Sequence, residues 1–189
     1  HLKGFEKLGA TCEIQAGNVI IAAEKLTPAK IVLRFPSVGA TQNLLMCACL
    51  IEGETILENV AKEPEVDDVI AFLNKMGADI RVGDKGQLIV HGKAALHGAE
   101  HTVVADRIET GSYILAACAT RGDVTATGCV PEHNSILLED LQEAGFTLDV
   151  TEDSARVHAY DGAIKPVRVR TAPYPGCPTD LQAPWLKLT

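Results

Sequence analysis

Two stretches of this sequence bring polar side chains to the expected start of a helix, where backbone groups can bind an anion. The first is Phe35-Pro36-Ser37-Val38-Gly39, which leads into apolar residues at helical spacing that continue to Ile51. The first N–H groups of a helix lack partners within the helix, and its dipole favours negative charge there. The segment can therefore hold a phosphate-like group. The alternative is that Ser37 only caps the helix.

The second stretch is Thr179-Asp180, which opens the last helical pattern of the chain. An aspartate at such a position is ordinarily an N-cap, because its carboxylate accepts hydrogen bonds from the first backbone N–H groups. On these residues alone, capping is the expected role of Asp180.

The cysteine and histidine residues do not have the spacing of metal ligands. The six Cys fit neither CxxC pairs nor a His/Cys zinc pattern. Cys47, Cys49 and Cys118 lie in apolar helix patterns, so we interpret them as small buried hydrophobic residues. No metal is expected, and a reduced cytoplasmic protein is the simplest interpretation.

Composition favours a folded domain and argues against two classes of partner. Of 189 residues 47% are hydrophobic, enough for a sizeable core. The net charge is −8 and the Lys and Arg residues are not clustered, which argues against nucleic acid and an anionic membrane surface. No apolar run approaches the roughly 20 residues of a membrane span. No signal peptide or initiating Met is visible, as expected of an excised segment.

Both stretches belong to an internal sequence repeat, and the repeated elements must position them. Two sets of markers recur with periods of 68 and 69 residues, namely Gly9, Gly77 and Gly145, and Thr41, Thr110 and Thr179. A fixed period of this size indicates several copies of one supersecondary unit that pack against each other. The chain begins in the last helix of one copy and ends inside the first helix of another.

One copy can be followed through its whole length. Hydrophobic periodicity and turn residues predict strands at 31–33, 55–58, 79–82 and 87–90, and helices from Ser37 to Ile51 and from Glu65 to Met76. Pro64 suits the first turn of the second helix, and Gly77 suits its C-terminal cap. The unit is therefore β-α-β-α-β-β.

The next copy is predicted in the same order. Strands are expected at 101–104 and 124–127, helices at 110–120 and 134–144, and a hairpin at 147–159. A strand at 167–170 would start a further copy, and residues 1–30 would end an earlier one.

Four segments of the chain strongly resemble UDP-N-acetylglucosamine enolpyruvyl transferases, also called UDP-N-acetylglucosamine 1-carboxyvinyltransferases. The segments are Ser37-Val38-Gly39-Ala40-Thr41, Lys62-Glu63-Pro64-Glu65, Asp106-Arg107-Ile108-Glu109-Thr110-Gly111, and Arg170 to Ala183 with Pro178-Thr179-Asp180. The match runs through the whole chain in order, and it covers less than half of the family's length, from its middle.

The resemblance implies an α/β (α+β) fold, the two-domain inside-out barrel of enolpyruvyl transferases. Each domain would contain three β-α-β-α-β-β units about a pseudo-threefold axis, incomplete here. Residues 1–104 would be the later part of one domain, and residues 105–189 the first part of the other.

The resemblance also implies the activity of the intact parent protein. That enzyme moves the enolpyruvyl group of phosphoenolpyruvate to the 3′-hydroxyl of UDP-N-acetylglucosamine and releases phosphate, without a metal or organic cofactor. It is the first committed step of peptidoglycan synthesis, so it serves cell wall biogenesis and cell shape, and it is the target of fosfomycin. The segment alone is expected to be inactive. The family's reactive Cys loop, or its Asp variant, and the Lys and Arg residues that bind phosphoenolpyruvate lie outside it.

Individual site residues follow from the same resemblance. Residues 35–39, Thr179 and His1 match substrate-binding positions, although some members of the family have Lys where this chain has Phe35. Asp180 matches the carboxylate proposed to take the proton of the sugar hydroxyl, which is a general-base role.

Four further motif residues are expected to be structural rather than chemical. Glu63 and Glu65 would contact the dipole at a helix start, and Asp106 and Arg107 would form a salt bridge where the chain crosses between domains. Two alternatives to the whole interpretation remain open: the shikimate-pathway enolpyruvyl transferase, which shares the fold, and a non-catalytic repeat module that binds a nucleotide sugar or a protein.

Overall fold

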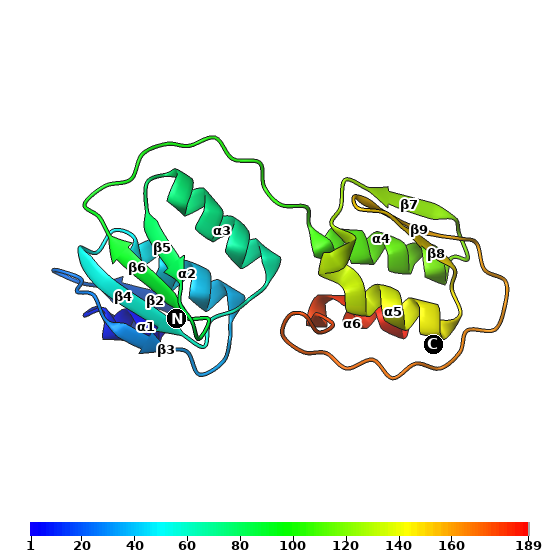
Figure 1. Ribbon diagram of the computed structural model, residues 1–189. Coiled ribbons are helices and arrows are strands. Elements are labelled where there is room, and N and C mark those ends of the chain that lie inside the picture. Colours follow the sequence, from blue (N-terminus) through cyan, green and yellow to red (C-terminus); the bar gives the residue numbers. More distant parts are fainter. Residues whose placement is uncertain (189) are drawn as a thin grey trace. The chain divides into compact units, whose positions relative to one another are not determined.

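The computed structural model describes residues 1–188, which form two compact units that divide between Val103 and Val104. Figure 1 shows the elements of both units along the chain. We call residues 1–103 unit 1 and residues from 104 onward unit 2.

Unit 1 contains the end of one repeat copy and the whole of the next. Its elements are α1 (Leu2–Lys7), β1 (Thr11–Gln15), β2 (Asn18–Ala22), β3 (Lys30–Val32), α2 (Val38–Ala48), β4 (Gly53–Glu58), α3 (Pro64–Lys75), β5 (Asp79–Val82) and β6 (Leu88–Gly92). The predicted β-α-β-α-β-β order is therefore confirmed for β3 to β6.

The main sheet of unit 1 has the strand order β3-β4-β6-β5. Strand β3 is parallel to β4, and α2 provides the crossover connection that a parallel pair requires. The β4–β6 and β5–β6 pairs are antiparallel. Helices α2 and α3 pack against this sheet (Figure 1). Full burial of a Leu or Val side chain contributes about 1.5–3 kcal/mol, so Leu44, Leu45, Leu57 and Val90, all 0% exposed, hold the two layers together.

Unit 2 repeats this order with one strand fewer. It contains α4 (Arg107–Ala119), β7 (Val124–Thr127), a 3₁₀ turn η1 (Pro131–Asn134), α5 (Ser135–Ala144), β8 (Leu148–Val150), β9 (Ser154–Val157), a second 3₁₀ turn η2 (Thr179–Leu181) and α6 (Gln182–Leu186). The sheet order is β7-β9-β8, with both pairs antiparallel. Its core gathers Ile114, Leu115, Leu141, Val157 and Leu181.

The helix signals read from the sequence are confirmed. Pro64 occupies the first turn of α3, and Gly77, just past its end, has φ +95°. Gly145 ends α5 with φ +108°, a left-handed conformation that favours glycine.

Two predicted strands are wrong. Residues 101–104 and 167–170 form no regular element. The alternation at 167–170 is correct, since Val167 and Val169 are half-buried while Arg168 and Arg170 are exposed. A strand also needs a neighbouring strand that accepts its backbone hydrogen bonds. Among the described residues, no strand pairs with either segment.

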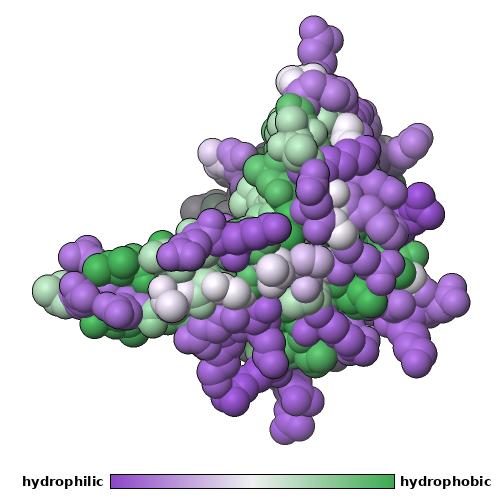
Figure 2. Space-filling model, turned by 90° about the vertical axis from the view of Figure 1, so that its left-hand side faces the viewer, coloured by the Kyte–Doolittle hydropathy of each residue, from purple (hydrophilic) through white to green (hydrophobic). Residues whose placement is uncertain are grey.

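The β1–β2 hairpin is a separate two-stranded sheet with aliphatic residues at its surface. Ile14 is 69% exposed, and Val19, Ile20 and Ile21 are each more than 40% exposed. In Figure 2 hydrophobic residues reach the surface among hydrophilic ones. Within residues 1–188, helices are all too short or too polar to cross a membrane.

Candidate functional site

The start of α2 combines a serine cap with two available backbone donors. Ser37 is the N-cap, and its Oγ accepts a hydrogen bond from the Ala40 N–H at 3.3 Å. Within the described residues the N–H groups of Val38 and Gly39 have no acceptor. Capping by Ser37 is confirmed, and it leaves donors that can bind an anion.

Thr41 fixes this turn relative to the segment that precedes α3. Its hydroxyl donates to the Ser37 carbonyl at 2.8 Å and accepts from the Ala61 N–H at 3.1 Å. Thr41 is fully buried, so both bonds are shielded from water.

His1 lies beside the same turn. Its Nδ1 is 3.0 Å from Nδ2 of Asn43 on α2. A Cβ added to Gly39 would lie 3.4 Å from Cε1 of His1, which is ordinary van der Waals contact, so the imidazole lies directly against this turn. The structure thus brings together His1 and the predicted segment 35–39.

A cavity of about 630 Å³ opens next to this turn. Three of the side chains that line it are cations, Lys3 and Lys7 of α1 and Arg34, which follows β3. Phe35 is 63% exposed and also lines it, as do His1 and Ser37. The sequence interpretation missed Lys3 and Lys7, whose four-residue spacing on one helix was the available signal.

Glu63 and Glu65 lie at the start of α3, near the α2 turn. Glu63 is the residue before the helix and is only 7% exposed. The backbone carbonyl of Glu65 accepts a hydrogen bond from Gln42 Nε2 at 3.3 Å, which connects α3 to α2. Both acids lie where a helix dipole favours negative charge.

In unit 2, Asp106 and Arg107 organise the start of α4. Oδ1 of Asp106 accepts the N–H groups of Ile108 at 2.8 Å and Glu109 at 3.0 Å, so Asp106 is an N-cap. The Arg107 guanidinium lies over the ring of Tyr174, 5.8 Å from its centroid, in a cation–π arrangement.

Asp180 differs from Asp106, and its predicted capping role is wrong. Residues Thr179–Leu181 form a 3₁₀ turn without a side-chain cap bond, and α6 begins after it at Gln182. Within residues 1–188 the exposed carboxylate of Asp180 has no hydrogen-bond or ion-pair partner, whereas the next residue, Leu181, is fully buried. The turn is anchored by the leucine and presents the carboxylate to solvent.

Cys49 and Cys118 are buried as predicted, whereas Cys47 is only half-buried. All six are free, and four are buried. Burial raises the pKa of Cys49 to about 11 and that of Cys118 to about 12, so both remain protonated thiols near neutral pH. Among the described residues no cluster of His, Cys, Asp or Glu could hold a metal ion.

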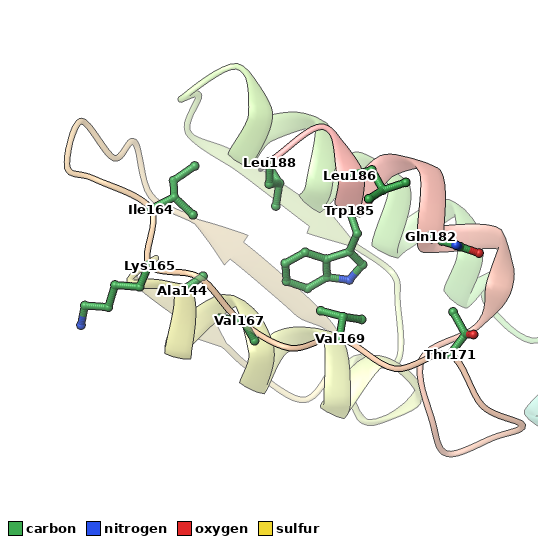
Figure 3. Close-up of a pocket in the computed structure, with 10 residues that line it drawn as sticks. All are labelled: Ala144, Ile164, Lys165, Val167, Val169, Thr171, Gln182, Trp185, Leu186 and Leu188. Carbon is green, nitrogen blue, oxygen red and sulfur yellow. The ribbon is translucent and has the colours of Figure 1, made fainter.

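A second cavity, which the sequence did not predict, lies inside unit 2. Figure 3 shows the indole of Trp185 pointing from α6 toward Val167 and Val169 of the 164–171 segment. The cavity measures about 260 Å³, and most of its lining is aliphatic. Trp185 is 7% exposed, and its Nε1 has no acceptor within residues 1–188. Val167 and Val169, the half-buried residues of the segment 167–170, form one wall of this cavity.

Comparisons with known proteins agree on one family. The sequence profile of EPSP synthase (3-phosphoshikimate 1-carboxyvinyltransferase) matches residues 1–189. The chain is 59% identical, over its whole length, to UDP-N-acetylglucosamine 1-carboxyvinyltransferase of Elusimicrobium minutum (strain Pei191). It is 44% identical to UDP-N-acetylglucosamine 1-carboxyvinyltransferase 2 of Staphylococcus saprophyticus. The chain spans 45% of the length of each of these relatives.

Solved structures show the same fold. The enolpyruvyl transferase NikO from Streptomyces tendae superposes with a TM-score of 0.80 at 25% identity, over 99% of this chain and 48% of that one. EPSP synthase from Acinetobacter baumannii gives a TM-score of 0.58 at 19% identity, over 83% of this chain and 38% of that one. The second similarity concerns the fold alone.

Proposed function

The chain belongs to the EPSP synthase (3-phosphoshikimate 1-carboxyvinyltransferase) family, and from this premise we propose that it is part of a UDP-N-acetylglucosamine 1-carboxyvinyltransferase. The observation that carries the proposal is the 59% identity, over every residue of the chain, to a relative of that name. The parent protein would transfer the enolpyruvyl group of phosphoenolpyruvate to the 3′-hydroxyl of UDP-N-acetylglucosamine. Units 1 and 2 would belong to its two different domains.

In this proposal unit 1 binds the nucleotide. The free N–H groups of Val38 and Gly39 would donate to the diphosphate, with Ser37 and Thr41 holding the turn in shape. His1 would contact the uridine part of the substrate beside Gly39.

Unit 2 would supply the proton acceptor. A carboxylate that neither caps a helix nor pairs with a cation is available to a substrate hydroxyl, and Asp180 meets this description among the described residues. As the sugar oxygen bonds to C2 of phosphoenolpyruvate, its proton would pass to Asp180, and C3 would take up a proton from an acid of the parent protein. Loss of phosphate from C2 together with a proton from C3 would then restore the double bond of the enolpyruvyl group. Thr179 would help to orient the carboxylate, and Asp106, Arg107, Glu63 and Glu65 would shape the site.

The cellular role follows from this activity and is part of the proposal. The parent protein would act in the cytoplasm at the first committed step of peptidoglycan synthesis. It would be a target of fosfomycin if its loop nucleophile is Cys, and it would need no metal or organic cofactor.

Phosphate release tests the proposal. A protein with the full length of the relatives that contains this sequence should release phosphate from phosphoenolpyruvate when UDP-N-acetylglucosamine is present, and not when 3-phosphoshikimate replaces it. The 189-residue chain alone should release none. Turnover with 3-phosphoshikimate only would instead assign the chain to the shikimate-pathway enzyme.

A further inference from the structure

We propose that Lys3, Lys7 and Arg34 form a cationic wall that binds the diphosphate of a uridine nucleotide in the cavity beside α2. The inference rests on the proposed function for the identity of the nucleotide. It adds three residues that the family resemblance does not assign.

The charge of the cavity sets it apart from the rest of the chain. The protein carries a net charge of −8, yet three cations and no Asp or Glu line this cavity. Lys3, Lys7 and Arg34 have no ion-pair partner within residues 1–188, whereas Lys30 of the same unit is paired with Glu58 at 2.8 Å. Unpaired like charges that face one space repel each other, and an anion placed there removes the repulsion.

The packing of α1 explains why its two lysines reach the α2 turn. Gly4 lies between them in sequence and is buried; a Cβ there would come within 2.4 Å of Leu44 Cδ1. The glycine therefore lets α1 approach α2 closely. Lys3 and Lys7, four residues apart, stand on one face of the short helix beside the cavity.

The remaining walls match the other parts of a nucleotide. Arg34 and Phe35 follow β3, and the exposed ring of Phe35 offers a flat face on which a base can stack. The N–H groups of Val38 and Gly39 supply neutral donors to phosphate oxygens. A volume of about 630 Å³ is within the range of small-molecule sites. An aromatic face beside three cations suits a nucleoside diphosphate better than a simple carboxylate.

Calorimetric titration of the 189-residue chain tests the wall, with UDP, uridine and inorganic pyrophosphate as separate probes. We expect UDP to bind more tightly than uridine, and its affinity to fall as salt is added. Lys3→Gln, Lys7→Gln and Arg34→Gln should each raise the Kd for UDP by about tenfold, as expected for loss of one charge-assisted hydrogen bond. Lys25→Gln is the matched control, because Lys25 lines a different cavity of unit 1.

The probes separate failure of the wall from failure of the proposed function. Unchanged UDP affinity in all three variants, with thermal melts like that of the parent chain, would overturn the wall and leave the proposed function standing. Absence of binding for both UDP and pyrophosphate would also overturn it. Pyrophosphate binding that equals UDP binding and weakens in the three variants would support the wall and contradict the nucleotide specificity of the proposed function.

Discussion

Units 1 and 2 follow the same sequence pattern, but only unit 1 completes the sheet that the pattern predicts. In unit 1, β3 pairs in parallel with β4, and Ile31 at its centre is 3% exposed. In the corresponding place of the next copy, residues 101–104 form no strand, and Val103 is 74% exposed. Consequently β4 is a central strand, whereas its counterpart β7 lies at the edge of its sheet.

A histidine explains why the 101–104 segment does not become a strand. His101 Nε2 lies 2.9 Å from Oδ1 of Asp68, and its ring is 5.2 Å from that of Phe72. Lys75 Nζ lies 3.2 Å from its other ring nitrogen. These three partners lie along α3, so His101 is held on a helix of unit 1. The comparison shows that an apolar strand pattern does not by itself form a strand, which also requires a partner strand.

The largest expected effect separates the two aspartates of unit 2 that stand near helix starts. In a protein with the full length of the relatives, Asp180→Asn should lower turnover by about 10²–10⁴, the usual contribution of a general base. The melting temperature should stay the same, because Asp180 makes no cap bond. Turnover and melting of one preparation provide the measurement.

Asp106→Ala is the matched control, since it should cost about 0.5–2 kcal/mol of stability by removing a cap. Near-normal turnover of Asp180→Asn would mean that this carboxylate is a binding contact rather than a base.

The next effect compares the equivalent threonines Thr41 and Thr110, which occupy the same place in α2 and α4. Both hydroxyls donate to the carbonyl of the capping residue, at 2.8 Å and 2.9 Å. Thr41 also accepts from the Ala61 N–H, so Thr41→Val leaves a buried donor unsatisfied and should cost about 1–3 kcal/mol. Thr110→Val should cost about 0.5–1.5 kcal/mol. Urea unfolding of both variants measures the difference, and equal losses would contradict the buried Ala61 contact as its cause.

The repeat, the Ser37 cap and the glycine ends of α3 and α5 could be predicted from the sequence because each depends on residues close together in the chain. Two boundaries differ from the prediction: α2 ends at Ala48 rather than Ile51, and α4 begins at Arg107 rather than Thr110 because Asp106 caps it. Pro64, Gly77 and Gly145 act within one helical turn. That Asp180 does not cap a helix could not be predicted in the same way, because it depends on a 3₁₀ turn in which the next residue, Leu181, is buried. The cationic cavity depends on contact between α1 and α2, which are far apart in sequence, and no local pattern reports it.

The difference in sheet position predicts a difference in local stability. Amides of β7 that bond to β9 should exchange with deuterium about tenfold faster than amides of β4 that bond to β6, because β4 is covered by strands on both sides. A tenfold ratio corresponds to about 1.4 kcal/mol of local opening free energy. Hydrogen–deuterium exchange resolved by NMR provides the measurement. Equal protection would mean that the edge position of β7 has no energetic consequence.

The smallest expected effect concerns the ion pairs that join the equivalent strands. In unit 1, Oε2 of Glu54 on β4 lies 3.2 Å from Nε2 of His91 on β6. In unit 2, Arg156 of β9 donates two hydrogen bonds to the carboxylate of Asp123, just before β7, from Nε at 2.8 Å and from Nη2 at 2.9 Å. These bonds from Arg156 hold the pKa of Asp123 below its usual value. A carboxyl whose pKa is lower in the folded than in the unfolded state stabilises the fold above its unfolded pKa, and this contribution disappears as the pH falls through the folded pKa.

Because the pair is exposed to solvent, its contribution to stability should be small and should weaken with salt. Titration of the Asp123 carboxyl by carbon NMR should show the lowered pKa, and Arg156→Gln should return it towards its usual value. The difference in stability between the parent chain and Arg156→Gln should be greatest near neutral pH and should vanish in acid. An unchanged Asp123 titration in the variant would mean that Arg156 does not anchor the edge strand, and that β7 is held by its backbone bonds to β9 alone.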